Sequence, residues 1–450
     1  MNNDSNKKKL TLLGVFALAI SGVAPTGSMA YGSAATAKVA GINIPLSFLL
    51  GGLGILCVAA SFASMAKYVS AAGSAYAYNR KAFGECGGFI TGWILTLAYL
   101  VLLVPQPGLT ANFINVFLKH FKMSISISLF AFIVIGVFWL ISLFGIKFTS
   151  KVALITEAIA LVVLLILSAV ILLKGGAKGI NIKPFIPHNN FGGIGQGMIF
   201  AVLSYSGFEE VSAVSIRTDN PKKTIPKTLI LTVLLIAIFY IVVTAVTVWG
   251  FGENNIATFA GSASPLDYLS AKYLGEPMAI VMDLAILLSA IASVLGCGNA
   301  CAYMIYALGQ HHYLPSKLGE FDYHINSPKN AVNLTALLAA IGYAVFGVPF
   351  GYQSIYSNAN VLGVLGLLIV YILVCVGNFV YFEKNSEIHF SIWSHAIVPL
   401  IGVLILIFPF ISNIYPVPKF PANLYPYIIV AWVVLGLILY YIHSHKSLNE

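Results

Sequence analysis

The sequence has 450 residues, of which 59% are apolar, 13% are aromatic and only 9% are charged. This composition excludes an ordinary water-soluble domain with one core and indicates a protein that crosses a lipid bilayer many times. The formal net charge of +9 comes from basic residues scattered over many short segments. Because no segment concentrates them, nucleic acid is not an expected partner.

Apolar runs of about 20 residues, the length that crosses a bilayer, recur along the whole chain. We count twelve, which predicts an all-α polytopic membrane protein. The first run continues past the small residues Ser28, Met29 and Ala30, so it is expected to be a transmembrane helix and not a cleaved signal peptide. The runs cover roughly residues 10 to 38, 43 to 66, 88 to 118, 125 to 145, 150 to 174, 192 to 216, 226 to 250, 277 to 308, 330 to 348, 353 to 380, 392 to 412 and 424 to 443.

The lysines and arginines are divided unevenly between the two sides of this arrangement. If the N-terminus is cytoplasmic, sixteen of the 24 basic residues fall in inner segments and eight in outer ones. Since positive charge is retained on the cytoplasmic side, we expect a multi-pass protein of the cell membrane with both termini in the cytoplasm.

The first span is interrupted in its middle by SGVAPTG, residues 21 to 27. Pro25 removes a backbone donor, and Gly22 and Gly27 weaken the helix on either side of it. We expect the helix to break here. A proline kink in a packing helix is the structural alternative.

The sixth span is interrupted by SYSGFEE, residues 204 to 210. The bilayer core offers no water to loose backbone groups or carboxylates, so a break at this depth is expected to line a polar cavity. The sequence therefore predicts a binding site at this point.

Breaks in spans one and six suggest two halves of five spans each. The loop after the second span, residues 67 to 87, and the loop after the seventh, residues 251 to 277, are both long and fall on opposite sides of the membrane. An inverted repeat has this property. The predicted units are a first half (1–190), an inverted second half (191–385) and a final helix pair (386–450).

Three segments resemble signatures of the amino acid-polyamine-organocation (APC) transporter superfamily. SAAGSAYAYNRKAFGECGGFITGW, residues 70 to 93, is similar to its first cytoplasmic loop. GFEE with DNPKKTIPKT, within residues 207 to 228, is similar to its sixth span and the following loop, and residues 297 to 332 resemble its eighth span and loop. In the first span, SGVAPTG replaces the Gly-Ser-Gly type of break found in many members.

The resemblance implies a leucine-transporter-like fold of about twelve helices, with spans one and six broken and the substrate between them. It also implies secondary transport of an amino acid or related amine by alternating access, driven by symport with protons or by exchange. The same fold carrying an amine or polyamine is the alternative, and a non-transporting sensor or a channel is a more remote one. The sequence holds no phosphate-binding loop and no hydrolase motif, so we expect neither ATP hydrolysis, nor an enzyme, nor a cofactor.

Backbone groups at the two breaks are the expected ligands of an amino acid. The N–H groups of Thr26, Gly27 and Ser28 begin a half-helix, whose positive end suits a carboxylate. The carbonyls of Leu203, Ser204 and Tyr205 end another half-helix and suit an ammonium group. The remaining expected lining residues are Ser21, Gly22, Tyr99, Ser206, Phe208, Glu209 and Ser289.

Carboxylates at membrane depth are the candidates for coupling. Glu209 and Glu210 either stabilise the start of a half-helix or supply one group that pairs with a cation or carries a proton. Glu157, in the fifth span, lies about one turn before the place where some APC members carry a lysine in place of a sodium ion. We assign proton or cation coupling to Glu157 and Glu210, with interhelical hydrogen bonding as the alternative for Glu157 and a weaker functional case for Asp283.

The cysteines and histidines indicate no metal centre. Cys297 and Cys301 share a helical face, where small apolar packing is the expected role. His311, His312 and His324 fall in the loop after the eighth span, where we expect solvated side chains.

Overall fold

The computed structural model describes residues 11–69, 74–187, 190–209, 211–212, 218–323, 325 and 327–447. Within these ranges the chain is helical and has no strand, apart from an isolated bridge between Asp322 and Ser327. The α-helices are α1 (Leu12–Val23), α2 (Pro25–Gly27), α3 (Ser33–Ala40), α4 (Ile44–Ala66), α5 (Ser74–Leu103), α6 (Gln106–Lys119), α7 (Ile127–Leu143), α8 (Ile146–Leu173), α9 (Phe191–Tyr205), α10 (Pro221–Phe251), α11 (Ile256–Gly261), α12 (Pro265–Leu274), α13 (Glu276–Gln310), α14 (Lys329–Gly342), α15 (Val348–Phe350), α16 (Tyr352–Lys384), α17 (Val398–Ser412) and α18 (Tyr425–Ser447).

Nine helical stretches in these ranges are long and apolar enough to cross a membrane, and α7 and α9 are shorter apolar helices. Large apolar side chains point outward on the outer helices, for example Leu140 on α7 and Leu404 on α17, which are 52% and 60% exposed. Such surfaces would be unfavourable in water but suit lipid. The chain is therefore a multi-pass membrane protein, while the count of twelve spans and the inverted repeat stay predictions.

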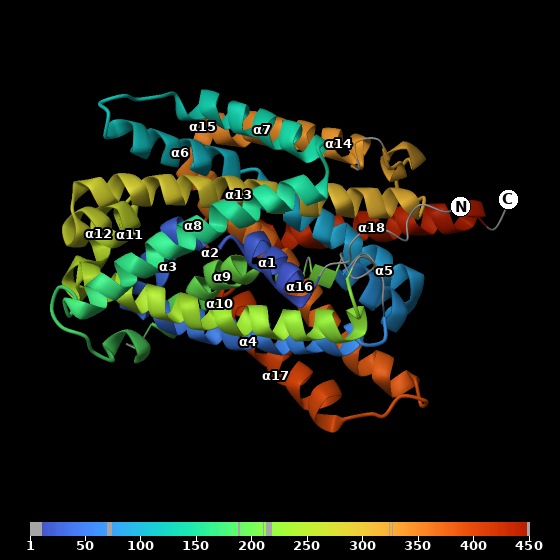
Figure 1. Cartoon of the computed structure of the whole chain (residues 1–450). Coiled ribbons are helices and arrows are strands. Elements are labelled where there is room, and N and C mark those ends of the chain that lie inside the picture. The colour runs from blue at the N-terminus through green and yellow to red at the C-terminus, as the bar shows by residue number, and fades with distance from the viewer. Residues whose placement is uncertain are drawn as a thin grey trace.

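The long helices run side by side along one direction, with α11 and α12 at one end of the molecule and both termini at the other (Figure 1). The most extensive packing joins α5 to α16, α4 to α10, and α8 to α13. These pairs bring together segments far apart in the sequence. The interruptions in α1–α3 and after α9 lie in the middle of this packing.

Two segments that we predicted as loops contain helices. In the first, α5 begins at Ser74 and changes direction at Gly84, whose φ of +82° is accessible to glycine. The second holds the short helices α11 and α12 between α10 and α13. The sequence pattern missed them because they are short and carry polar residues, unlike the long apolar runs that define the spans.

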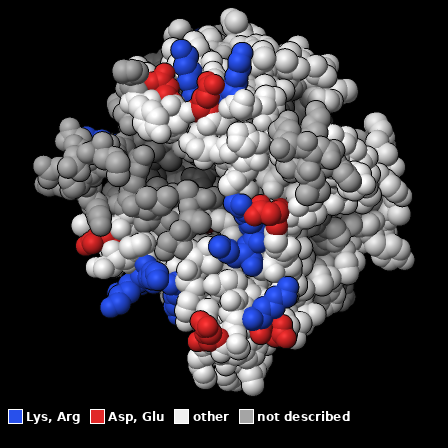
Figure 2. All heavy atoms as spheres, turned by 90° about the vertical axis from the view of Figure 1, so that its right-hand side faces the viewer, with Lys and Arg blue, Asp and Glu red and all other residues white. Residues whose placement is uncertain are grey.

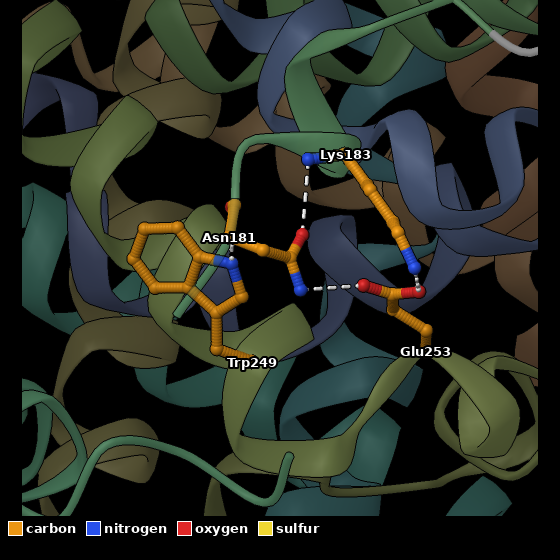
Figure 3. Close-up of polar contacts among 4 residues, drawn as sticks. All are labelled: Asn181, Lys183, Trp249 and Glu253. Carbon is orange, nitrogen blue, oxygen red and sulfur yellow. Dashed lines mark hydrogen bonds and ion pairs between the residues drawn. The ribbon is translucent and has the colours of Figure 1, made fainter. Parts of the chain in front are cut away.

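The loop that joins α8 to α9 is tied to the end of α10 by polar contacts (Figure 3). Trp249 Nε1 donates to the carbonyl of Asn181 over 3.0 Å, and Asn181 Nδ2 donates to Glu253 Oε1 over 2.7 Å. Lys183 Nζ lies 3.3 Å from the other oxygen of Glu253. These bonds fix the loop on the face opposite the termini.

Helix α18 is joined to α5 by a reciprocal pair of tryptophans. Trp93 Nε1 donates to the carbonyl of Trp432 over 2.8 Å, and Trp432 Nε1 donates to the carbonyl of Trp93 over 2.9 Å. The two rings are stacked at 4.4 Å with an angle of 8°. Gly436 leaves room for this stack, because a Cβ there would lie 2.5 Å from the ring of Trp93.

The face that carries the termini is shown in Figure 2, with basic and acidic side chains interspersed over it. The visible lysines, arginines and carboxylates form no single dense patch among the residues that the structure describes there. This distribution agrees with the scattered basic residues of the sequence.

Candidate functional site

The first interruption lies between α1 and α2, at Ala24. Ala24 adopts a left-handed conformation, with φ 46° and ψ 61°, and its N–H donates to the carbonyl of Ile20. Pro25, with φ suited to a first helical position, then begins α2. The break that the sequence predicts within residues 21 to 27 is thus confined to one residue, and Gly22 stays helical.

The second interruption follows α9, which ends at Tyr205. Gly207 has a φ of +100°, a conformation that a side chain would strain. A Cβ on Gly207 would also lie 2.7 Å from the carbonyl oxygen of Gly22. The second interruption therefore contacts the backbone of the last turn of α1, just before the first interruption, although the two segments are far apart in the sequence.

A short 3-10 turn, and not a long helix, follows the second interruption in the described chain. It includes Phe208, Glu209, Val211 and Ser212, and no α-helix lies between Tyr205 and Pro221 in the part that the structure describes. Our prediction that the sixth span resumes as an apolar helix falls largely on residues 213–217, which lie outside the described residues.

A polar cavity lies where the two interruptions meet. It offers about 60 Å³ for the centres of water-sized molecules, which is room for only a few waters. No lining residue among those described carries a charged side chain. The lining residues are Gly22, Val23, Gly27, Ser28, Tyr99, Leu102, Gln106, Leu109, Phe113, Leu203, Ser204, Ser206, Gly207, Ala290, Ser293, Cys297 and Tyr356.

The start of α2 is capped by two side chains from other helices. Glu157 Oε1, from α8, accepts a hydrogen bond from Thr26 N over 2.8 Å. Ser289, from α13, accepts from Gly27 N over 2.7 Å and donates through its hydroxyl to Glu157 Oε2. Two of the backbone donors that we predicted for a substrate carboxylate are thus engaged by the protein in this conformation.

The end of α9 is also engaged within the protein. The carbonyl of Leu203 accepts from the backbone N–H of Ser206 over 3.1 Å and from its hydroxyl over 2.6 Å. The carbonyl of Ser204 accepts from Tyr240 over 2.7 Å. A carbonyl oxygen has two lone pairs, so these contacts occupy both lone pairs of the Leu203 oxygen, while Tyr240 occupies one lone pair of the Ser204 oxygen.

Glu209 is buried behind the cavity and does not line it. Its Oε1 accepts hydrogen bonds from Tyr99 over 3.0 Å and from Tyr371 over 3.1 Å, and its Oε2 accepts from Gly207 N over 3.0 Å. The carboxylate thus joins α5 and α16 to the second interruption. Tyr99 belongs to both regions, since it also lines the cavity.

The predicted substrate-binding residues separate into three groups. Seven line the cavity: Gly22, Gly27, Ser28, Tyr99, Leu203, Ser204 and Ser206. Five lie around it: Thr26, Tyr205, Phe208, Glu209 and Ser289. The side chain of Ser21 and the whole of Glu210 lie outside the described residues.

Two of the residues in the second group point away from the cavity. Tyr205 donates through its hydroxyl to the carbonyl of Phe48 on α4 over 3.1 Å. The ring of Phe208 contacts the rings of Phe62 and Tyr371 in a buried aromatic cluster. The expected cavity-facing rings are therefore not found in this conformation, because Tyr205 is held against α4 and the turn at Ser206 and Gly207 directs Phe208 to the aromatic cluster.

Several cavity residues were not expected from the sequence. Gln106 and Ser293 add polar groups, and Tyr356, from α16, packs edge-on against Tyr31 at 4.6 Å. The sequence gives only a weak indication that Gln106 would line the cavity: it is a polar residue within a proline-flanked break of the third span, VPQPG. The sequence around Tyr356 gives no indication that this residue would line the cavity.

One other sequence prediction, that of solvated loop histidines, is corrected by side-chain contacts. His311 is not simply solvated, because its Nε2 lies 3.3 Å from Arg80 Nη1 and its ring lies beside that of Tyr76. His324 lies outside the described residues. Asp283 is buried and pairs with His120 over 2.9 Å. By contrast, Cys297 and Cys301 do share the face of α13 that packs against α5, and neither forms a disulfide.

Comparison with known proteins agrees with this architecture. The profile of the family described as amino acid permease matches residues 14–450. The chain is 25% identical over 464 residues to the branched-chain amino acid permease BcaP of Lactococcus lactis, covering 97% of this chain and 94% of that protein. It is 23% identical over 466 residues to a methylthioribose transporter of Bacillus subtilis, covering 98% and 94%. It is also 27% identical over 408 residues to the gamma-aminobutyric acid permease of Escherichia coli, covering 84% and 82%. With a family match over nearly its whole length, this chain belongs to the amino acid permease family.

Proposed function

We propose that this protein is a secondary active transporter that carries a net-neutral amino acid across the cell membrane by alternating access. The observation that carries the proposal is the contact of Gly207, at the second interruption, with Gly22, in the last turn of α1 just before the first interruption. Both residues line the central cavity. Broken helices in membrane transporters expose such backbone at the substrate site. The likeness to amino acid permeases supports the same assignment.

The cavity lining favours a zwitterion over a polyamine. No described lining residue is charged, so no side chain there would offset the multiple positive charges of a polyamine. Apolar groups of Val23, Leu102, Leu109 and Phe113 line the cavity beside the polar backbone. This mixture suits an aliphatic amino acid, and a relative named for branched-chain amino acids points in the same direction.

Substrate binding requires the interruptions to move apart. The cavity holds only a few waters, and the donors at Thr26 and Gly27 are engaged by Glu157 and Ser289. Tyr31 and Tyr356 contact each other on the side toward α12. We infer that this conformation is closed, and that opening on either side accompanies the release of these contacts.

Glu157 is the proposed coupling residue. Its side chain is fully buried, and no described lysine or arginine forms an ion pair with it. A proton on Glu157 would weaken its acceptance of the Thr26 N–H, which frees that donor for a substrate carboxylate. Protonation and substrate binding would thereby be linked at one backbone group.

The proposed orientation places both termini in the cytoplasm, and the proposed topology is twelve spans with two inverted five-helix halves. Lys67 directly follows α4, and Lys384 is the last residue of α16, at the helix ends nearest the termini. Retention of positive charge on the cytoplasmic side supports this orientation.

The test is uptake by proteoliposomes. Purified full-length protein should accumulate labelled leucine, isoleucine or valine, and unlabelled substrate inside the vesicles should accelerate entry by counterflow. Saturation and counterflow would exclude a channel, and the absence of uptake for all twenty amino acids would overturn the proposal. A thermal-shift screen with amino acids and common amines gives an independent measure, since a ligand stabilises the state that it binds.

A further inference from the structure

Three potential metal ligands meet at the end of the molecule that holds α11 and α12 (Figure 1). His120 directly follows α6, Asp267 lies in the first turn of α12, and Asp283 lies in the second turn of α13. Each of the three residues comes from a different element. The cluster is therefore made by the tertiary fold and lies apart from the central cavity.

The distances within this cluster suit a tetrahedral ion. His120 Nε2 lies 2.9 Å from Asp283 Oδ2 and 3.6 Å from Asp267 Oδ1, and all three ligand atoms lie within 4.8 Å of one another. Zinc bonds to nitrogen and oxygen are about 2.0–2.2 Å long, which separates neighbouring ligands of a tetrahedron by about 3.3–3.6 Å. The separation of 2.9 Å is shorter than this range, and that of 3.6 Å lies at its upper end.

The cluster has an excess of negative charge and an unused ligand atom. Two carboxylates face one imidazole, and Glu276 acts on Asp267 as a further negative charge. Asp267 Oδ1 is buried and has no hydrogen-bond partner. A buried acceptor without a donor is unfavourable, and a divalent cation would satisfy it.

The second oxygen of Asp283 has its own partner. Ser264, just before α12, lies with its hydroxyl 3.4 Å from Asp283 Oδ1, and the Asp283 side chain is 1% exposed. Such outer contacts hold a metal-binding carboxylate in place. Asp267 and His120 are less buried, with exposed fractions of 26% and 17%, so an ion can reach them from solvent.

We propose that His120, Asp267 and Asp283 form a binding site for a divalent transition-metal ion of the Zn²⁺ type, with water in the remaining position. Imidazole with carboxylates suits Zn²⁺, whereas Mg²⁺ prefers oxygen ligands in an octahedron. Without a metal, Nε2 of His120 hydrogen-bonds Asp283 directly. With the ion in place, α12 is fastened to the end of α6 and to α13.

The test is metal binding by the untagged full-length protein in detergent, measured by isothermal titration and by the thermal-unfolding midpoint in ZnCl2. One equivalent of Zn²⁺ should bind and raise the midpoint, and MgCl2 should not. H120A and D267N should each weaken binding by more than the roughly 10- to 100-fold cost of losing an outer-shell partner. D267H, which offers a second imidazole, should bind at least as tightly as the wild type.

The matched control is H311A, which removes a histidine from the opposite end of α13. It should bind Zn²⁺ as the wild type does. Equal binding by H120A, D267N and the wild type would overturn the site, and so would an equal response to Mg²⁺. Because this measurement needs no transport, its result is independent of the proposed transport function.

Discussion

Glu157 caps the helix that begins at Pro25, because its Oε1 accepts the Thr26 N–H over 2.8 Å. A side chain from α8 thereby fills the anion-binding end of a half-helix that a substrate carboxylate would otherwise use. In the proposed mechanism, the protonation of Glu157 and the release of the Thr26 N–H for a substrate carboxylate therefore occur together. Substitutions of Glu157 can therefore distinguish a coupling role of this residue from a purely structural one.

Replacing Glu157 with glutamine should preserve the cap and remove the titratable group. The amide oxygen can still accept from Thr26, and the amide nitrogen can donate to Ser289. We expect E157Q to retain counterflow and to lose uptake driven by a pH gradient. Proteoliposomes assayed with and without the gradient measure both.

The structural contribution of the same residue is tested by E157A. This change leaves the Thr26 N–H unsatisfied in the interior, at a cost of about 1–3 kcal/mol. The unfolding midpoint of E157A should fall below that of E157Q. Gradient-driven uptake by E157Q at the wild-type rate would contradict the coupling role.

Gly207 should not tolerate alanine. Its φ of +100° is unfavourable for a residue with a Cβ, at a cost of about 1–3 kcal/mol, and the added atom would lie 2.7 Å from Gly22 O. We expect G207A to lower the unfolding midpoint and to reduce uptake about tenfold or more, since 1.4 kcal/mol corresponds to a factor of ten. The matched control is G136A, in the middle of α7, where a Cβ would meet nothing within 4 Å. Wild-type uptake by G207A would show that the interruptions need not touch.

Tyr371 should contribute to stability more than to substrate affinity. Its hydroxyl donates to buried Glu209 over 3.1 Å, but the residue does not line the cavity. Y371F should destabilise the protein by about 1–3 kcal/mol through loss of a hydrogen bond to a buried carboxyl. The apparent KM should change little. Y427F, at a site 73% exposed on α18, is the control and should leave the unfolding midpoint unchanged.

The KM for the substrate should distinguish Y99F from Y371F. Tyr99 donates to the same oxygen of Glu209 over 3.0 Å and also lines the cavity. Y99F should therefore raise KM in addition to lowering the unfolding midpoint. Identical KM values for the two variants would indicate that Tyr99 makes no contact with substrate.

The contact between Arg80 and His311 should weaken in acid. Burial first, and then the nearby positive charge of Arg80, lowers the pKa of His311 from its usual 6.5, while Glu85 opposes this shift and His312 adds to it. The neutral imidazole accepts from Arg80 Nη1 over 3.3 Å, and protonation removes this acceptor. The unfolded chain binds the proton first as pH falls, so this contribution is present above pH 6.5 and is lost as pH falls toward the lower folded pKa.

The unfolding midpoint measured between pH 8 and pH 5 tests this prediction. H311Q keeps an acceptor for Arg80 but cannot be protonated, so its midpoint should fall less than that of the wild type over this range. H312Q, next to it, is the matched control, because the structure shows no corresponding contact with Arg80 for His312. Parallel curves for wild type and H311Q would show that the His311 charge is not linked to folding.

The sequence predicts those features whose cause is local. Apolar runs mark the long helices because each must present apolar surface to lipid over a fixed length. Pro25 with its flanking glycines marks the break at Ala24, and Ser206 with Gly207 marks the end of α9, since these residues disfavour helix whatever surrounds them. Six of the seven expected residues that line the cavity, all except Tyr99, follow from these two breaks alone.

Contacts between residues far apart in the sequence cannot be predicted from such local patterns. Nothing near Glu157 indicates that its partner is the backbone of Thr26, 131 positions away, or that Asp283 meets His120 at a separation of 163. The same holds for Glu209, whose two tyrosine partners come from α5 and α16. A carboxylate in a membrane helix needs a polar or charged partner, and this much can be predicted from the sequence. Which residue becomes its partner depends on how the helices pack.

The paired indoles of Trp93 and Trp432 also bear on how α18 is positioned in the membrane. Helix α18 presents much of its side-chain surface to lipid, with Val430 61% and Tyr441 64% exposed. Lipid contacts are similar at any depth or rotation, so they do not fix the position of the helix. The two carbonyl acceptors and the gap beside Gly436 occur at only one height on α5. These contacts, and not the lipid, therefore fix the depth and rotation of α18.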